Sequence, residues 1–229
     1  MEYLIDGFIR AAQLLLRGNE EAYSTIWTTL KVSSLSIIFS LLLGLPSGFM
    51  LSYLNFPGKK QIRAVVDTLL ALPTVVVGIF IYGFISKRGP LGEFNLLFTI
   101  SGIVAAQTIL ILPIVISLTA SAIEGLDNRL MLTLITLGAK GKQLVFSIIY
   151  EARYAIFTAA VTAYGRAISE VGISMMIGGN IKWHTRTITT AIALESGKGD
   201  FAMGIALGII LLSIALFVNC SLIMLRRKA

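Results

Sequence analysis

The sequence predicts an all-α integral membrane protein with five transmembrane helices, preceded by an amphipathic helix that lies at the membrane interface. Two observations predict this class. Hydrophobic residues make up 56% of the 229 residues, charged residues only 14%, and the mean hydropathy is +0.85, whereas soluble domains carry about 25% charged residues. Long apolar stretches without Asp, Glu, Lys or Arg recur along the chain, and a membrane-spanning helix needs about 20 such residues.

Residues 1–18 are expected to form the amphipathic interfacial helix. Polar side chains recur there at steps of three or four residues, with apolar residues filling the opposite face; they are Glu2, Asp6, Arg10, Gln13 and Arg17. Gly18 and Asn19 then end the helix. A cleaved signal peptide is not expected, because acidic residues stand where cations belong. A short sixth span is the alternative, and it would bury several charges.

Residues 19–229 are expected to hold the five spans. The first, second, third and fifth contain no Asp, Glu, Lys or Arg and cover residues 32–58, 68–86, 94–123 and 201–225. The fourth, residues 154–181, is apolar apart from Arg166 and Glu170. Charges inside a bilayer are costly, so these two side chains face a water-filled pathway or form a structural ion pair on one helical face.

Small and kinking residues inside the spans indicate close helix packing. Gly44 and Gly48, and likewise Gly204 and Gly208, have the spacing that lets helix backbones approach. Prolines within a span kink helices and free carbonyl groups, and they occur at positions 46, 73 and 113. The first span also has a hydroxyl-rich side, either for packing or for a pathway, formed by Ser33, Ser34, Ser36 and Ser40.

The distribution of Lys and Arg predicts the orientation. These residues are more numerous on the side that carries residues 59–63, 124–153 and 226–228, and such loops face the cytoplasm. The N-terminus is therefore expected outside and the C-terminus in the cytoplasm. The loop 124–153 is expected to form helix, glycine turn and helix, either as a hairpin on the membrane surface or as an element that docks a partner. The net charge of +7 then reflects topology, and no nucleic-acid partner is expected.

No catalytic constellation is visible in the sequence. The single histidine, His184, falls in an outer loop, and the single cysteine, Cys220, has no partner for a disulfide or a zinc cluster. The segment from Gly138 to Gln143 lacks the spacing of a phosphate-binding loop. We therefore expect neither enzymatic activity nor a metal or cofactor in this chain.

Five motifs together resemble a known family. They are Thr29-Leu-Lys-Val-Ser-Ser, Leu72-Pro-Thr-Val-Val-Val-Gly, Leu137-Gly-Ala, Ser169-Glu-Val-Gly after Arg166, and Asn180-Ile followed by Thr185-Arg-Thr-Ile. From Thr28 onward the chain resembles the permease subunits of ATP-binding-cassette importers of the molybdate and tungstate branch. The segment from Thr185 to Glu195, followed by Gly197-Lys-Gly-Asp, is most similar to bacterial tungstate permeases.

The resemblance implies a type I ABC importer permease fold and ATP-driven uptake of tungstate by alternating access. Molybdate and sulfate are the alternative substrates. The implied partners are a second permease copy in a homodimer, two ATP-binding subunits that bind ATP and Mg, and an extracytoplasmic tungstate-binding protein, assembled in the lipid bilayer of a bacterial or archaeal cell membrane. A secondary transporter would usually show two similar halves, and a membrane scaffold would explain neither Arg166, Glu170 nor the loop around Gly138.

Three groups of site residues follow from the resemblance. The ATPase-coupling loop corresponds to Thr136, Leu137, Gly138, Ala139, Lys140 and Gly141, although Leu132-Thr-Leu replaces the family's E-A-A and Tyr150-Glu151 replaces its L-P. The translocation pathway corresponds to Arg166, Ser169 and Glu170. An outer loop that contacts the anion or the binding protein corresponds to Thr185, Arg186 and Thr187.

Overall fold

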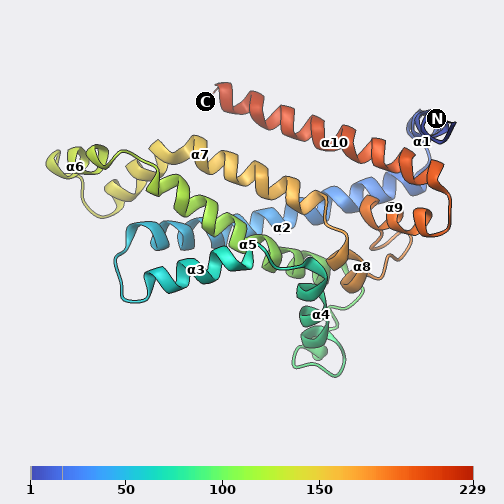
Figure 1. The fold of residues 1–229 in the computed structure, drawn as a ribbon, viewed down its shortest axis with the longest axis horizontal. Coiled ribbons are helices and arrows are strands. Elements are labelled where there is room, and N and C mark those ends of the chain that lie inside the picture. Colours follow the sequence, from blue (N-terminus) through green and yellow to red (C-terminus); the bar gives the residue numbers. More distant parts are fainter. Residues whose placement is uncertain (1, 17, 229) are drawn as a thin grey trace.

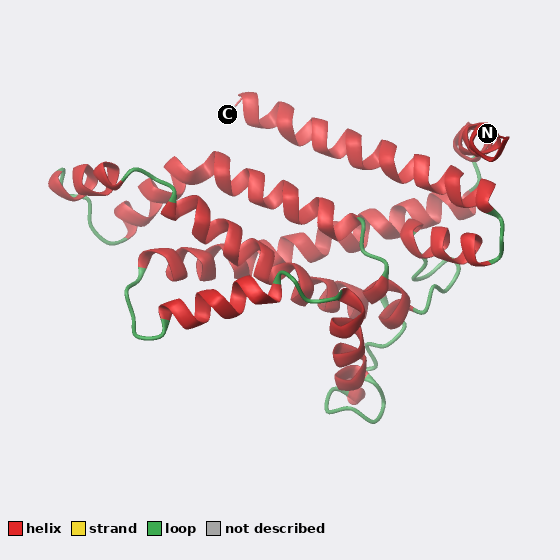
Figure 2. Cartoon of the chain, viewed as in Figure 1, coloured by secondary structure: helices red, strands yellow, loops and turns green. Residues whose placement is uncertain are grey.

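The computed structural model describes residues 2–16 and 18–228, and these contain helices and loops but no strand (Figure 2). Four long helices run along the long axis of the molecule (Figure 1). They are α2 (Glu20–Tyr53), α5 (Ile100–Glu124), α7 (Lys142–Ile168) and α10 (Phe201–Lys228). The shorter helices are α1 (Glu2–Leu16), α3 (Lys59–Leu69), α4 (Thr74–Ile85), α6 (Asn128–Thr136), α8 (Gly172–Gly178) and α9 (Ile188–Gly197), with a 3₁₀ turn at Gly92–Phe94.

The four long helices are long and apolar enough to cross a membrane, and α3 with α4 forms a fifth candidate as a bent pair. The all-helical prediction is thus confirmed. The five predicted spans are present if the bent pair of α3 and α4 is taken as one span. The first span is longer than predicted. Helix α2 begins at Glu20, where the side chain of Asn19 accepts a hydrogen bond from the Ala22 N–H, so Lys31 lies inside the helix.

The predicted span 68–86 is not a continuous helix. Helix α3 ends at Leu69, α4 begins at Thr74, and the two are bent by 102°. Pro73 explains the break, because proline disfavours α conformation in the preceding residue and here stands at the N-cap of α4. Figure 1 shows α4 projecting sideways from the long helices. Pro46 and Pro113 lie inside α2 and α5, which continue through them.

The predicted span 154–181 is also interrupted. Helix α7 ends at Ile168, and α8 begins at Gly172. A carboxylate oxygen of Glu170 accepts a hydrogen bond from the Ile173 N–H at 3.0 Å, which caps the new helix. A Cβ added at Gly172 would lie 3.0 Å from Oγ1 of Thr74. The interruption before α8 therefore packs against the start of α4, and the two broken spans meet.

Helices α2 and α5 are in close contact at the predicted glycine pair. A Cβ at Gly44 would lie 2.6 Å from Cγ1 of Val115, and one at Gly48 would lie 2.7 Å from the Ile116 carbonyl oxygen. Both glycines are required by this contact. The second predicted pair differs, because a Cβ at Gly204 would meet Ser196 Oγ at 2.9 Å, whereas one at Gly208 would meet no atom within 4 Å.

Helix α1 packs against α10 rather than standing alone. Ala11 is buried in a cluster with Ala206, Leu207 and Ile210 of α10. Arg10 forms an ion pair with Asp200 at 3.1 Å, just before α10 begins. In Figure 1 α1 is seen end-on while α10 runs across the view, so the two helices cross steeply. Its location at the membrane interface stays a prediction.

Candidate functional site

The ion pair predicted within the fourth span is present at the end of α7. Nη1 of Arg166 lies 2.7 Å from Oε2 of Glu170, and the Glu170 side chain is 1% exposed, against 36% for Arg166. The other carboxylate oxygen accepts the Ile173 N–H, and the Glu170 carbonyl accepts the hydroxyl of Thr189 on α9. Glu170 is therefore fully hydrogen-bonded where α7, α8 and α9 join. Ser169 is exposed beside it, and its hydroxyl donates to the Arg166 carbonyl at 3.2 Å.

A buried amide that the sequence analysis did not single out lies behind this ion pair. Gln107 of α5 is 2% exposed, and its Nε2 donates to the Ala167 carbonyl at 2.8 Å. Its Oε1 accepts a hydrogen bond from Ser36 of α2 at 3.0 Å. Gln107 thus joins α2, α5 and the end of α7. The signal was available, since Gln107 is the one amide in the apolar sequence of α5 and a polar group at that depth needs partners.

The hydroxyl-rich side of α2 serves packing in the structure. Ser33, Ser36 and Ser40 are buried. The single hydroxyl proton of Ser36 is shared between Gln107 Oε1 and the Val104 carbonyl, which lies 3.3 Å from Ser36 Oγ, while Ser40 donates to the Thr108 carbonyl at 3.3 Å. Through these bonds the hydroxyls of the α2 serines find acceptors on α5, and the bonds join the two helices next to the glycine pair.

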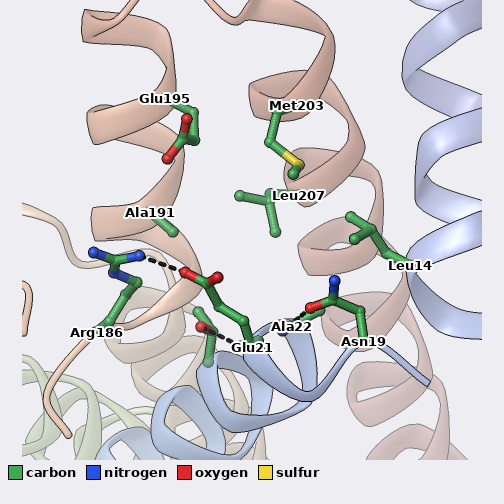
Figure 3. A pocket seen from close by; sticks show the side chains of 10 residues that line it. Leu14, Asn19, Glu21, Ala22, Arg186, Ala191, Glu195, Met203 and Leu207 are labelled. Atoms are coloured by element: carbon green, nitrogen blue, oxygen red, sulfur yellow. Dashed lines mark hydrogen bonds and ion pairs between the residues drawn. The ribbon is translucent and has the colours of Figure 1, made fainter. Parts of the chain in front are cut away.

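Two cationic side chains contact one carboxylate at the N-terminal end of α2. Nη1 of Arg186 lies 2.6 Å from Oε1 of Glu21, and Nζ of Lys182 lies 2.7 Å from its Oε2. Figure 3 shows Arg186 and Glu21 at a pocket of about 130 Å³ between α2, α9 and α10, which Glu195 also lines. The Nε of Arg186 is buried without a hydrogen-bond partner, so the guanidinium keeps one donor unused.

The two threonines beside Arg186 hold the chain instead of facing outward. Thr185 is fully buried, and its hydroxyl donates to the Gly178 carbonyl at 2.5 Å and accepts from the Ile181 N–H. Thr187 is 3% exposed and caps α9 together with Thr190. Of the three residues predicted for the outer loop, Arg186 lines the pocket, while the hydroxyls of the two threonines are used for bonds within the chain.

The predicted coupling loop forms a helix and a glycine turn at one end of the molecule. Helix α6 ends at Thr136, and Gly138 and Gly141 have positive φ values of 83° and 52°, which glycine adopts without steric cost. Ala139 packs against the buried cluster of Leu144 and Ile148, whereas Leu137 is 79% exposed. Lys140 is exposed as well. Figure 1 shows α6 standing clear of the long helices.

Comparison with known proteins identifies the class to which this architecture belongs. Residues 26–229 match the family described as binding-protein-dependent transport system inner membrane component. The chain belongs to this family. It is accordingly a multi-pass membrane permease of an ABC importer, and the expected family and fold class are confirmed.

Among its relatives the chain is similar to permeases named for tungstate and for molybdenum. The chain is 47% identical over 219 residues to the tungstate uptake system permease protein TupB of Campylobacter jejuni, covering 96% of this chain and 92% of that protein. It is 37% identical over 228 residues to TupB of Peptoclostridium acidaminophilum, covering 100% of both. The molybdenum transport system permease protein ModB of Escherichia coli is 31% identical, covering 86% of this chain and 91% of that protein.

Solved structures share the fold at low sequence identity. An inward-facing structure of the MetNI methionine ABC transporter matches with a TM-score of 0.72 and 18% identity, covering 94% of this chain and 95% of that one. A bacterial alginate ABC transporter, in complex with a periplasmic protein that holds an alginate pentasaccharide, matches with a TM-score of 0.76 and 19% identity, covering 94% and 81%. These likenesses show the fold alone.

Proposed function

We propose that this chain forms the gated membrane path of an importer that takes up tungstate, delivered by an extracytoplasmic binding protein. The observation that carries the proposal is the similarity to two tungstate uptake permeases over almost the entire chain. Molybdate is the second candidate, because a molybdenum permease is also similar, at lower identity. Sulfate is the third, since sulfate permeases match at 27% and 25% identity.

Tungstate entry requires an energy source. Moving one elementary charge across 100 mV is worth about 2.3 kcal/mol, so a dianion that enters a negative cytoplasm faces roughly 5 kcal/mol before any concentration gradient. We assign this energy to two ATP-binding subunits, which would bind the ATP and Mg. The exposed turn from Thr136 to Gly141 is the docking site for them, together with α6 before it, because this end protrudes and exposes the apolar side chains of Leu132 and Ile135 on α6 and of Leu137 in the turn.

A homodimer is favoured by the shape of the chain. Helix α4 leaves the long helices and exposes the large apolar side chains of Val75, Ile79, Phe80 and Phe84. A second copy would cover this projecting helix and complete a path that four or five helices alone cannot enclose. Alternating access then corresponds to movement of the two copies relative to each other when the ATP-binding subunits close.

The pathway is proposed to run past the junction of the two broken spans. The start of α4 and the interruption before α8 adjoin there, and transporters place substrate sites at such discontinuous helices. The guanidinium of Arg166 is about one-third exposed beside Ser169. Its positive charge attracts an anion, and the neighbouring Glu170 weakens that attraction, which favours passage over tight binding. Arg186 is the proposed outer contact for the anion or for the binding protein.

The substrate is tested by elemental mass spectrometry of cells that contain or lack this permease, grown with nanomolar tungstate and molybdate together. Loss of intracellular tungsten alone in the deletion strain, restored by the wild-type chain, is the expected result. Loss of molybdenum instead would assign the chain to the second candidate. Unchanged tungsten and molybdenum, with reduced uptake of labelled sulfate, would assign it to the third.

A further inference from the structure

A groove between α2 and α5 combines an apolar floor with a cationic end. It is lined by Lys31, Leu35, Phe39 and Leu43 from α2 and by residues from Ile100 to Ile109 of α5. From these lining residues we propose that the groove binds one anionic phospholipid, with its phosphate at Lys31 and one acyl chain along the groove. This site is separate from the pathway and from the docking turn.

The position of Lys31 relative to the bilayer supports the proposal. Lys31, Leu35, Phe39 and Leu43 follow one another at steps of four residues and line the groove together. Tyr23 and Trp27 precede them on α2 at the same spacing. Trp27 is 69% exposed, and exposed Trp and Tyr mark the headgroup level of a membrane. Lys31 lies one turn below Trp27, where its long side chain reaches the headgroups.

The cationic end has further groups that suit a phosphate. Lys31 is exposed and forms no ion pair with any residue whose placement is described. Helix α5 begins beside it at Ile100. The Gly102 N–H already donates to the Thr99 hydroxyl, and the positive end of the helix dipole attracts anions there. Ser101 is exposed in the same groove, so its hydroxyl is a further donor. The headgroup is therefore expected to be anionic.

The groove also has the length of one leaflet. Lys31 and Leu43 are twelve residues apart, which is about 18 Å along a helix, and half of the bilayer core is about 15 Å thick. Phe39 and Leu43 are 48% and 56% exposed, so they are open to an acyl chain. The occupied leaflet is the one on the side of Trp27.

Native mass spectrometry of the purified permease tests this site with phosphatidylglycerol and phosphatidylcholine of identical acyl chains. The wild-type chain should prefer phosphatidylglycerol. Lys31→Gln should lower its affinity for phosphatidylglycerol about fivefold, the effect expected for one lysine at an anionic surface, and leave phosphatidylcholine binding unchanged. Lys60→Gln, an exposed lysine on α3, is the matched control and should keep the wild-type preference.

A second variant addresses the apolar part of the site. Ala105 is exposed in the groove, so Ala105→Phe fills it and should weaken binding of both lipids without lowering the melting temperature. An unchanged lipid preference in Lys31→Gln, or unchanged binding in Ala105→Phe, would overturn the proposal. So would an efficient disulfide between two copies carrying Phe39→Cys in a Cys220→Ser background, because a second copy would then occupy the groove.

Discussion

Glu170 shows at the scale of one residue why the sequence left two roles open for the charges of the fourth span. A four-residue spacing fits both a structural ion pair and a pathway. In the structure the Glu170 carboxylate is buried and bonded to both Arg166 and the Ile173 N–H. The carboxylate therefore has a structural role. The guanidinium is partly exposed, so an anion can still reach it.

Comparison of the Arg166→Gln variant with the Arg166→Gln, Glu170→Gln double variant separates the two roles. Arg166→Gln leaves a buried carboxylate without its counter-charge, and we expect a loss of about 3 kcal/mol in the free energy of unfolding. Adding Glu170→Gln removes the uncompensated charge and should recover much of that stability. Denaturant unfolding in detergent measures both variants.

Tungsten uptake by the stable double variant then tests whether Arg166 belongs to the translocation pathway. We expect slow uptake, because the path has lost its cation. Normal uptake by the folded double variant would assign a purely structural role to the pair and would remove Arg166 from the pathway.

The contact between α2 and α5 makes a prediction at the scale of the element. Gly48→Leu places a side chain against the Ile116 carbonyl and Thr119 and should destabilise the chain by about 1–3 kcal/mol or prevent packing. At Gly208, in the second glycine pair, an added Cβ meets no atom within 4 Å, so Gly208→Leu is the matched control. It should keep or slightly raise the melting temperature, because leucine favours a helix. Equal effects of the two variants would contradict the role of the α2–α5 contact.

Helix α6 with its glycine turn makes a second prediction at this scale. Leu137→Asp puts a charge on a side chain that is 79% exposed, so the permease should fold normally but no longer co-purify with its ATP-binding subunit. Leu91→Asp, at an exposed leucine in the loop after α4, is the control and should keep the association. Retained co-purification of the Leu137 variant, as judged by subunit ratio, would argue against docking at this turn.

For the whole molecule, the placement of cations predicts how the chain is oriented in the membrane. In a Cys220→Ser background, Lys198→Cys should react with a membrane-impermeant maleimide in intact cells, while Lys60→Cys should react only after the cells are opened. Both lysines are exposed, so accessibility within the protein does not limit the reaction. The reverse pattern would place the N-terminus in the cytoplasm.

Composition and charge-free length were enough to predict the helical class, and the glycine turn at 138 follows from local sequence. The interruptions could not be predicted with the same ease, because a hydropathy pattern does not tell a straight span from a bent one. Pro73 breaks its helix, yet Pro46 and Pro113 do not. The difference depends on the neighbours that each segment meets after folding. The hydrogen bonds by which Gln107 of α5 joins α2 and α7 likewise link residues that are far apart in the sequence.

The 102° bend between α3 and α4 has a consequence for the lipid around the protein. At the end of α3 the carbonyls of residues 67–69 accept the N–H groups of residues 70–72 in a turn. The carbonyls of residues 70–72 accept no backbone N–H among the described residues, and hydrocarbon cannot solvate them. Residues 70–73 must therefore face another protein chain or water. Leu70 and Leu72 are 44% and 37% exposed within this chain, so the cover comes from outside it. Lipid is therefore excluded on this side. The layer of lipid that contacts each subunit does not close into a ring but stops at the bend.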